Sequence, residues 1–339
     1  MLKKYLILYC IATVFLVGCK PGKVTSNQEI AKDNKYDSEF PNKSVSSNLS
    51  YISKTVKKLD VLAFYATYYF PPESNVYRNN LNDSILRNYS DNMVITNESV
   101  LGTVSVIYNN NNLLGLLTCA HIVDFKDSIF SFYNEENKIQ TLSIKIKQQN
   151  HISELASGDP IKIVALNKEK DIALLMKRTD SDNQNIQTLD YPVGKANDLQ
   201  WGTVVYIMGF PLGTLMVTRA IVSMTSKQKI GQFVTDALYN RGISGSPVFA
   251  VRDGVPNFEL VGMASSSAAQ ESDILVPEPI KKTDGTIKIP YEGNLFVDNN
   301  KLISYGVTYS VTIDEIATFI LTNEEALIFN GFDVNYFFK

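Results

Sequence analysis

The pattern of short hydrophobic runs from Met93 onward constrains the fold most strongly. Runs of Val, Ile, Leu, Tyr and Thr alternate with clusters of Asn, Gly and Asp, of which Asn109–Asn112 is one. β-Branched and aromatic residues favour strands, whereas Asn and Gly favour the turns that join antiparallel strands. The sequence therefore predicts an all-β domain rich in hairpins.

A serine stands in a glycine-rich turn within Gly242–Ser246. Glycines on both sides of Ser244 permit a tight turn and the close approach of a substrate. The amides of Gly242 and Ser244 are then able to converge on the oxyanion that forms when a serine attacks a carbonyl. Because Gly-x-Ser-Gly also occurs in ordinary turns between strands, the motif needs partners elsewhere in the chain.

Two further residues complete a possible nucleophilic site. His121 ends one apolar run and Asp171 begins another, whereas the second histidine, His151, lies in a polar segment. A histidine after a strand is often structural, and an aspartate before a strand is often a turn residue. The chain order His, Asp, Ser nevertheless occurs in catalytic triads, in which a histidine base, a carboxylate that orients it and a serine nucleophile act together. We therefore expect a hydrolase in which His121 is the base, Asp171 orients it and Ser244 attacks.

The segments around these residues resemble those of trypsin-like serine proteases. Thr118–His121 resembles the histidine segment of that family, and Thr235–Pro247 resembles the nucleophile segment of its bacterial HtrA/Deg branch. Further segments resemble the strands and closing helix of the second half of that domain: Gly202–Gly213, Val217–Ser223, Glu259–Met263 and Tyr305–Ile316.

The resemblance covers roughly residues 95–322. It implies two antiparallel six-stranded β-barrels of the chymotrypsin class, at about residues 95–182 and 195–310, followed by a C-terminal helix. It also implies a serine endopeptidase that acts on protein or peptide substrates from a cleft between the barrels. Residues 323–339 form a tail that is too short for the PDZ domain of HtrA proteins.

Two departures from the family affect the expected mechanism. Ile243 precedes the nucleophile where digestive trypsin-like enzymes carry an aspartate, so activation by a freed N-terminus is not expected. Ser246 replaces a glycine, as in glutamyl endopeptidases, but neither His121 nor His151 can be placed in a pocket that recognises glutamate. The resemblance implies pocket walls without charge and hence a small or medium apolar side chain at the cleavage site; these walls are Leu238, Tyr239, Met263, Ala264 and Ser265.

The chain begins with a second strong signal. Lys3 and Lys4 precede the apolar stretch Tyr5–Val17, which is short for a membrane span and typical of a signal peptide. Leu16–Cys19 resembles the lipobox of bacterial lipoproteins. We therefore expect a lipoprotein signal peptide at residues 1–18 and acylation of Cys19, which would anchor the protein to a membrane of the bacterial cell envelope on a leaflet that the sequence leaves open. An ordinary signal peptide or an uncleaved anchor is the alternative.

Composition suggests how the remaining segments are organised. Residues 19–55 are rich in Lys, Asn, Ser and Asp and are expected to form a tether. Residues 56–94 are expected to form an N-terminal extension that packs on the first barrel. The long, proline-containing stretch Ala268–Lys301 is expected to be an insertion near the substrate cleft.

Several ligand classes are not expected. The net charge of −3 and the absence of a dense basic stripe argue against nucleic acid. No histidine or cysteine spacing typical of a metal site occurs, and no nucleotide-binding fingerprint is present, so we expect neither metal nor cofactor. With Cys10 removed and Cys19 acylated, Cys119 would be the one remaining cysteine, expected as a small buried residue beside the base.

Two other functions stay open. A protease-like module with a latent site would bind unfolded or partner peptides without cleaving them. A hydrolase of esters or lipids would share the chemistry but is expected on a different fold. The sequence does not indicate an oligomeric state.

Overall fold

The computed structural model describes residues 32–41, 43–133, 136–155, 158–179, 186–277, 293 and 295–337. It divides into two units, Met1–Asp33 and Asn34–Lys339, and the second contains every element discussed below. The predicted signal peptide and Cys19 lie outside the described residues. Among the described helices, none combines the length and the apolar character needed to span a bilayer.

The first half of the domain is a seven-stranded antiparallel sheet in the order β4-β5-β1-β2-β3-β7-β6. Its inner strands β3 and β7 are apolar and buried almost throughout, while β1 alternates between buried and partly exposed positions. Such alternation is typical of a sheet with one face on the core. The strands are β1 (Val56–Tyr69), β2 (Met93–Asn110), β3 (Leu113–Thr118), β4 (Ser128–Phe132), β5 (Ile139–His151), β6 (Lys162–Asn167) and β7 (Ile172–Arg178).

The second half is a closed six-stranded barrel in the order β10-β13-β12-β11-β8-β9. Strands β8 and β11 are buried at every position. On one face their side chains lie inside the barrel, and on the other face they pack against the first sheet. The strands are β8 (Val204–Gly209), β9 (Met216–Met224), β10 (Gln232–Thr235), β11 (Pro247–Val251), β12 (Phe258–Pro277) and β13 (Leu295–Thr312).

The all-β fold with a closed second barrel and a C-terminal helix is confirmed. The first half differs in detail from the predicted six-stranded barrel, because it is an open sheet of seven strands. The additional strand is β1, which lies between β5 and β2. The segment interpreted as an extension ahead of the first barrel thus contributes a central strand of its sheet.

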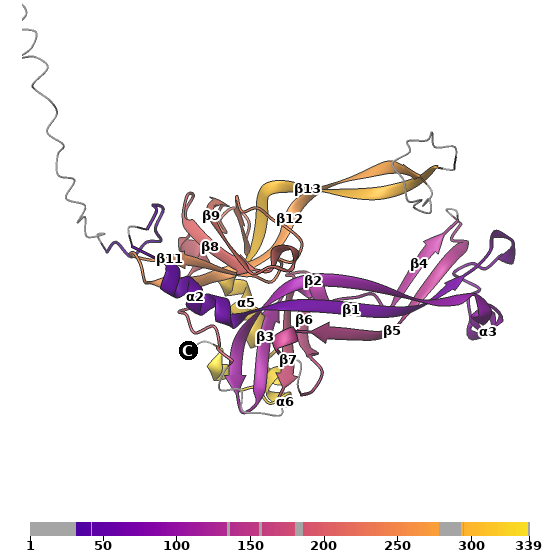
Figure 1. Ribbon diagram of the computed structural model, residues 1–339, viewed down its shortest axis with the longest axis horizontal. Coiled ribbons are helices and arrows are strands. Elements are labelled where there is room, and N and C mark those ends of the chain that lie inside the picture. Colours follow the sequence, from indigo (N-terminus) through magenta and orange to yellow (C-terminus); the bar gives the residue numbers. More distant parts are fainter. Residues whose placement is uncertain are drawn as a thin grey trace, which may run out of the picture. The chain divides into compact units, whose positions relative to one another are not determined.

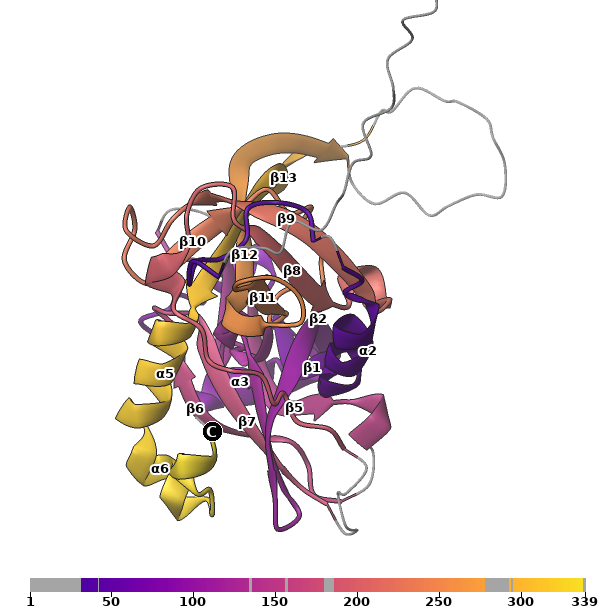
Figure 2. The same cartoon turned by 90° about the vertical axis from the view of Figure 1, so that its left-hand side faces the viewer.

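The helices of the described residues are short: α2 (Ser46–Thr55), α3 (Asp83–Asn88), α4 (Ala120–Val123), α5 (Ile313–Thr322) and α6 (Glu324–Phe329). Helix α5 is capped by the preceding Thr312, whose hydroxyl accepts a hydrogen bond from the Glu315 amide, and it buries Ile316, Phe319 and Ile320. Figure 2 shows α5 and α6 on one side of the strands and α2 on the other. The C-terminal helix therefore closes the domain as predicted.

The segment from Asn34 to Thr55 packs on the domain, although composition predicted a tether. Tyr36 is buried, its hydroxyl donates to Glu259 at 2.5 Å, and its ring lies 4.0 Å from the guanidinium of Arg252. Ile52 on α2 is fully buried in the main core. A few apolar and aromatic residues are enough to hold a polar segment on the domain when the barrel offers them complementary partners. The average composition of the segment does not reveal these single contacts.

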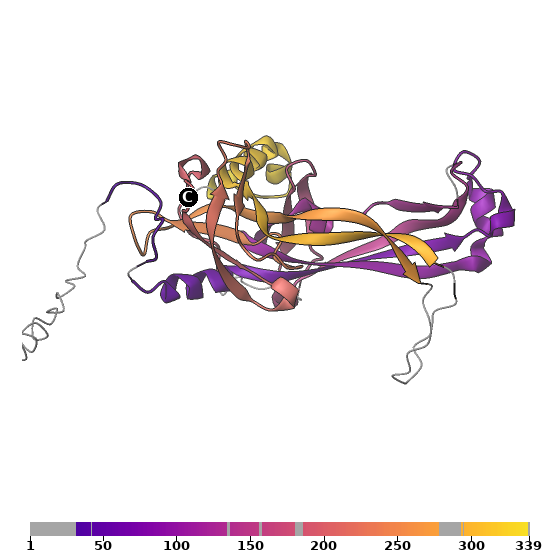
Figure 3. The ribbon, with the colours of Figure 1, turned by 90° about the horizontal axis from the view of Figure 1, so that it is seen from above.

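A long β-ribbon leaves the barrel where the sequence predicted an insertion. It consists of the distal parts of β12 and β13, which pair from Ala269 with Ile303 to Pro277 with Leu295. The ribbon extends in the same direction as the far ends of β1, β2, β4 and β5 (Figure 1), and the view from above agrees (Figure 3). The sequence expectation of an insertion therefore corresponds to a strand extension over its described residues.

Candidate active site

The three residues that the sequence singled out as a catalytic set lie together where the first sheet meets the barrel. His121 Nδ1 lies 2.9 Å from each carboxylate oxygen of Asp171. His121 Nε2 lies 3.1 Å from Ser244 Oγ. An imidazole placed in this way can accept the proton of the hydroxyl while the carboxylate fixes the orientation of the ring.

The position of His121 follows from a short helix at the end of a buried strand. Helix α4 begins directly after Cys119, and the Asp124 amide donates to the Ala120 carbonyl at 2.9 Å. Ile122 and Val123 on this turn are buried. The apolar neighbours thus hold the backbone, whereas the imidazole remains 46% exposed and accessible to a substrate.

Asp171 is held by backbone geometry and by several donors. It has φ of +57°, which aspartate tolerates better than most residues, and it follows a turn in which Asn167 Oδ1 accepts from the Lys170 amide at 2.9 Å. The His121 amide and the Ser265 hydroxyl also donate to its carboxylate, at 3.0 and 2.5 Å. Burial by itself raises the pKa of Asp171, but these hydrogen bonds and the His121 ring outweigh it, so the pKa lies below its ordinary value. The carboxylate is therefore ionised and fixed.

Two glycines allow the nucleophile loop to lie directly against its neighbours. Gly242 has φ of +102° and a Cβ there would lie 2.2 Å from the Phe210 carbonyl oxygen. Gly245 has φ of +88° and a Cβ would lie 2.0 Å from the Thr103 carbonyl oxygen. Both positions require glycine, for conformation as well as for space. The glycine-rich motif thus has the structural role that the sequence analysis gave it.

Thr103, a residue that sequence reasoning missed, connects this loop to the first sheet. Its amide donates to the Ser244 carbonyl at 2.8 Å and its hydroxyl donates to the Gly242 carbonyl at 2.6 Å. The same hydroxyl accepts from the Phe210 amide at 2.9 Å, and the Thr118 hydroxyl donates to the Thr103 carbonyl at 2.7 Å. No sequence signal distinguishes Thr103 from other threonines in strands, since its role depends on a loop far along the chain.

The backbone around Ser244 leaves two amides able to bind an oxyanion. The Arg241 carbonyl accepts a hydrogen bond from the Leu212 amide at 2.8 Å, so this carbonyl faces Leu212. Within the described chain, neither the Gly242 nor the Ser244 amide donates to another group, whereas the Ile243 amide donates to the Asn240 carbonyl at 3.2 Å. The two amides named by the sequence analysis are therefore available, as an oxyanion hole requires.

The two departures from the family motif are accommodated by packing. Ile243 is 1% exposed and lies in the apolar cluster of the barrel. Ser246 is buried against Gly209, where a Cβ would lie 1.8 Å from the Ser246 hydroxyl oxygen. An apolar contact thus replaces the buried charge pair that an aspartate before the nucleophile would need.

The residues predicted to line a substrate pocket are placed very differently from one another. Leu238 is 63% exposed. Met263 and Ala264 lie on β12 and are buried in the core. Ser265 lies beside the nucleophile, and its carbonyl accepts from Ser244 Oγ at 2.9 Å. Only Ser265 and Tyr239 therefore touch the nucleophile.

Tyr239 fills the space beside the nucleophile. Its hydroxyl is in hydrogen-bond contact with Ser244 Oγ and donates to the Ser265 carbonyl at 3.1 Å. The side chain is buried, and this burial raises the pKa of Tyr239 well above its ordinary value despite the Ser244 contact. The phenol therefore stays protonated and shares the Ser265 carbonyl as an acceptor with Ser244 Oγ.

Cys119 lies close to the site as a buried thiol. Its Sγ donates to the Ala264 carbonyl at 3.4 Å, and burial raises the pKa of Cys119. Ligand atoms of Cys119, His121 and Asp171 lie within 4.8 Å of one another. A protonated thiol and an imidazole already bonded to a carboxylate favour hydrogen bonding over metal ligation.

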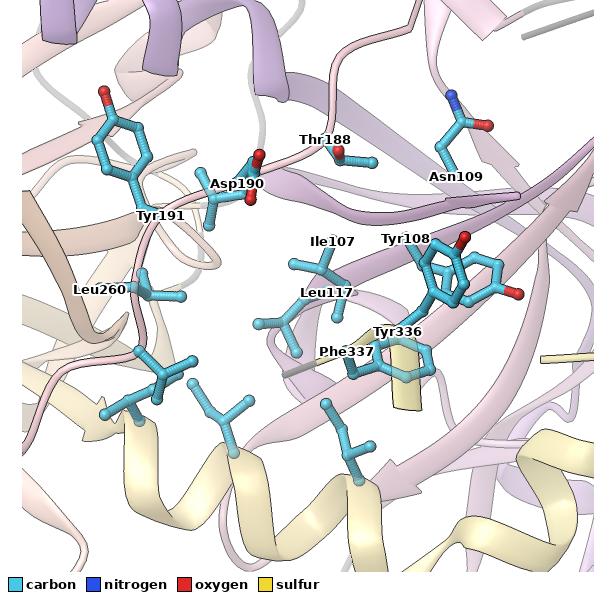
Figure 4. Close-up of a pocket in the computed structure, with 15 residues that line it drawn as sticks. Ile107, Tyr108, Asn109, Leu117, Thr188, Asp190, Tyr191, Leu260, Tyr336 and Phe337 are labelled. Atoms are coloured by element: carbon cyan, nitrogen blue, oxygen red, sulfur yellow. The ribbon is translucent and has the colours of Figure 1, made fainter. Parts of the chain in front are cut away.

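A separate cavity of about 240 Å³ lies between α5, the connection from the first sheet to the barrel, and strands β2 and β3. Figure 4 shows Ile107, Leu117 and Leu260 directed toward it, with Tyr336 and Phe337 at one side. None of the residues that line it belongs to the His121, Asp171 and Ser244 set. Its walls combine apolar side chains with Asn109, Thr188 and Asp190, and none of the residues that line it is a serine, a cysteine or a histidine.

An antiparallel sheet packed on a closed six-stranded barrel, followed by a C-terminal helix, defines a chymotrypsin-like fold. Residues 89–263 match the family model described as the trypsin-like peptidase domain, and the chain belongs to this family. The matched range contains His121, Asp171 and Ser244, and it ends before the ribbon.

The crystal structure of the serine endoprotease from Yersinia pestis is similar, with a TM-score of 0.40 and 18% sequence identity over 85% of this chain and 68% of that chain. No curated protein matches the sequence.

Proposed function

We propose that the protein is a serine endopeptidase with His121, Asp171 and Ser244 as its catalytic residues. The observation that carries the proposal is the imidazole that bridges Asp171 and Ser244 at 2.9 and 3.1 Å. Membership of the trypsin-like peptidase family supports it. The available amides of Gly242 and Ser244 add the electrostatic part of such a site.

The proposed reaction proceeds through an acyl-enzyme. Ser244 Oγ attacks the peptide carbonyl and gives its proton to His121 Nε2, while the amides of Gly242 and Ser244 bind the oxyanion. The imidazolium, stabilised by Asp171, then protonates the leaving amine as the C–N bond breaks. Water attacks the ester with His121 as base, and the carboxylic acid product leaves with Ser244 restored.

Labelling of residues 20–339 with a fluorophosphonate probe tests this proposal. We expect one modified residue, Ser244, with labelling abolished in Ser244→Ala and strongly reduced in His121→Ala. Casein hydrolysis should fall by about 10⁶ in Ser244→Ala, as for other serine proteases, while the circular dichroism spectrum stays unchanged. Casein turnover by the Ser244→Ala variant would contradict the assignment.

We propose that Tyr239 narrows the side-chain preference of the site. Because its phenol already lies against Ser244 and Ser265, we expect Gly, Ala or Ser rather than large residues before the cleaved bond. A library that varies this position should show that preference in the wild type, and Tyr239→Ala should extend it to larger apolar residues. An unchanged profile in Tyr239→Ala would contradict this role.

The same contact favours a second candidate function, that of a latent peptide-binding module. A tyrosine that stays on the nucleophile would block attack without disturbing the rest of the site. In that case the folded wild type would not react with the fluorophosphonate, Tyr239→Gly would gain reactivity, and peptides would bind without turnover. Rapid labelling of the wild type would exclude this candidate.

We propose that the enzyme is anchored to a membrane of the bacterial cell envelope through acylated Cys19. The lipobox-like Leu16–Cys19 at the end of an apolar run supports this. Expression in a bacterial host with a radiolabelled fatty acid should label the wild type and place it in the membrane fraction, whereas Cys19→Ala should lose the label. A labelled Cys19→Ala variant would contradict the anchor.

A further inference from the structure

An open pocket of about 430 Å³ lies between the start of helix α2 and strands β8 and β9, and none of the three catalytic residues lines it. The segment that leads into α2 passes the outer face of β9 there (Figure 2). The ring centroid of Phe40 lies 4.2 Å from the guanidinium carbon of Arg219, and this cation–π contact holds the segment at the pocket. Phe40, Leu49 and Val217 give the wall an apolar part.

The polar part of the wall is positively charged. Lys43 and Arg219 line the pocket, and neither forms an ion pair with a described residue. Among the described residues of the wall, none is an aspartate or a glutamate. Helix α2 begins at the same wall, with no acidic residue in its first turn and no side-chain cap at Val45. Its N-terminus therefore adds partial positive charge to that of the two cations.

A buried hydroxyl in this wall has no hydrogen-bond partner. Tyr206 on β8 is 4% exposed, lies opposite Arg219 on β9, and its hydroxyl forms no hydrogen bond within the described residues. Burial raises the pKa of Tyr206, the nearby Arg219 opposes this in part, and Asp37 adds to it. The phenol is therefore protonated at neutral pH and able to donate. Because a buried donor without an acceptor is unfavourable, a bound anion would stabilise it.

We infer that this pocket binds the phosphate head group of an anionic phospholipid. The choice of occupant rests on the membrane anchor proposed above. Lys43, Arg219 and the N-terminus of α2 neutralise the phosphate, and the Tyr206 hydroxyl donates to it. The apolar side chains at the wall contact the glycerol and the first carbons of the acyl chains. The contact orients the domain on the membrane to which Cys19 is attached.

The surface around the pocket favours a lipid over a soluble anion. Phe40 is 71% exposed. Val217 and Ile221 lie on the same outer face of β9 as Arg219 and are 44% and 42% exposed. Exposed apolar side chains next to cations are typical of surfaces that lie in the head-group region of a bilayer. A free phosphate would use the cations but would leave these apolar side chains in water.

The chain ahead of the pocket limits its distance from the proposed anchor. Cys19 and Asn34 are 15 positions apart, and a fully extended chain of that length spans at most about 55 Å. Tyr36 holds the chain on the barrel through Glu259, and Phe40 follows at the pocket. A domain linked so closely to an acylated residue meets lipid head groups at a high effective concentration.

Binding of unacylated protein to vesicles tests the inference. Residues 20–339 are sedimented with phosphatidylcholine vesicles that contain or lack phosphatidylglycerol, and we expect binding at least about tenfold tighter with the anionic lipid. The net charge of the chain is −3, so anionic vesicles repel the protein as a whole and binding requires a local site. Equal binding to both kinds of vesicle, or none, would overturn the inference.

Two arginine variants assign the binding to the pocket. Arg219→Gln should weaken binding to the anionic vesicles about fivefold. The matched control is Arg87→Gln, which removes the same charge from an exposed arginine of α3 outside the pocket and should leave binding unchanged. If Arg219→Gln does not fold, Lys43→Gln at an exposed position replaces it. Equal losses in the pocket variant and the control would overturn the inference.

Tyr206→Phe removes the hydroxyl alone. Since this hydroxyl has no partner among the described residues, we expect thermal stability without lipid to be retained and affinity for the anionic vesicles to fall about tenfold. Lower stability with unchanged affinity would mean that the hydroxyl serves the fold, and would contradict its contact with the phosphate.

A soluble anion is separated from a lipid by calorimetry with inorganic phosphate. We expect phosphate to bind far more weakly than the anionic vesicles, and Phe40→Ala to weaken vesicle binding. Tight binding of phosphate, together with vesicle binding that Phe40→Ala leaves unchanged, would assign the pocket to a soluble anion and overturn the inference.

The experiments also separate this inference from the proposed anchor. Failure of fatty-acid labelling in the wild type would reject acylation of Cys19 but would leave the vesicle binding of residues 20–339 to be measured. Absence of vesicle binding by that protein would reject the inference even if Cys19 is acylated.

Discussion

The two ends of strand β12 differ in how many neighbours hold them. The strand pairs with β11 from Phe258 to Met263 and with β13 from Gly262 onward, so both neighbours flank Gly262 and Met263, and Met263 and Ala264 are buried. From Ala269 to Pro277 it pairs, among the residues that the structure describes, with β13 alone, and Leu275 is exposed. The near end carries Ser265 against Asp171 and Ser244, whereas the far end reaches away from the barrel.

The difference shows how one strand joins a fixed part of the molecule to an exposed part. Groups at a reactive site must keep their geometry, and Ser265 keeps its own through hydrogen bonds to Asp171 and Ser244, next to the buried Met263 and Ala264. The far end has one neighbouring strand among the described residues, and its side chains are exposed. Substitutions at the near end should therefore affect chemistry and stability, whereas those at the far end should change neither strongly.

Among the substitutions that compare the two ends, the largest effect is expected for Asp171→Asn, which changes the carboxylate that Ser265 contacts at the near end. The amide cannot stabilise the imidazolium and favours the wrong tautomer of His121, so kcat should fall by about 10⁴. Steady-state kinetics with a short peptide measures the loss. A fall of less than tenfold in a folded variant would mean that Asp171 does not orient the base.

Two glycine substitutions compare the anchored loop with the base of the ribbon. Gly245→Ala places a Cβ 2.0 Å from the Thr103 carbonyl oxygen, and the displaced loop should reduce fluorophosphonate labelling by about 10² to 10³. The control is Gly306→Ala on β13, which has φ of +79° but nothing within 4 Å of the added methyl. Backbone strain should lower the free energy of unfolding of this variant by about 1–2 kcal/mol, and fluorophosphonate labelling should be retained. Similar losses of labelling in both variants would show that the nucleophile loop is no more sensitive to an added methyl group than Gly306 on β13.

Ser265→Ala removes one hydrogen bond to the Asp171 carboxylate. A hydrogen bond to a charged group contributes about 1.5–3 kcal/mol, so we expect kcat to fall about tenfold. Because the pKa of Asp171 is lower in the folded than in the unfolded protein, its carboxylate stabilises the fold above the unfolded pKa, and this stabilisation is lost as the pH falls through the folded pKa.

The same substitution removes one of the causes that lower the pKa of Asp171, so the folded pKa should rise. Stability at neutral pH should decrease and acid unfolding should begin at a higher pH than in the wild type. Thermal denaturation between pH 7 and pH 3 measures both changes, with Ser266→Ala as the matched control. An unchanged acid transition would mean that the hydroxyl has no influence on the carboxylate.

The smallest expected change is at the far end. Leu275→Asn and Val297→Thr alter exposed side chains and should change the free energy of unfolding by no more than about 0.5 kcal/mol. Cleavage of a short peptide should also stay the same. Chemical denaturation and short-peptide kinetics check this, and a large loss of stability would show that the two ends of β12 are not independent.

The strand-rich fold was predictable because each strand shows its pattern locally. The closed barrel, the C-terminal helix and the turn glycines follow from apolar runs, turn residues and the family resemblance. The sequence predicts an extension where β1 lies, because the pairing of β1 with β2 and β5 is a tertiary property. For the same reason polar composition predicts a tether around Tyr36, which the structure places against Glu259 and Arg252.

The sequence by itself determined which residue types are present for nucleophilic chemistry and their order along the chain, because Ser244, His121 and Asp171 each lie in a recognisable local context. Tertiary structure alone decided which side chains meet at the site and which strands pair: Thr103 beneath the nucleophile loop, Ser265 on the carboxylate, Tyr239 on the nucleophile, and β1 between β2 and β5. A turn or an apolar run is set by neighbours in sequence, whereas these contacts depend on which strands meet in space.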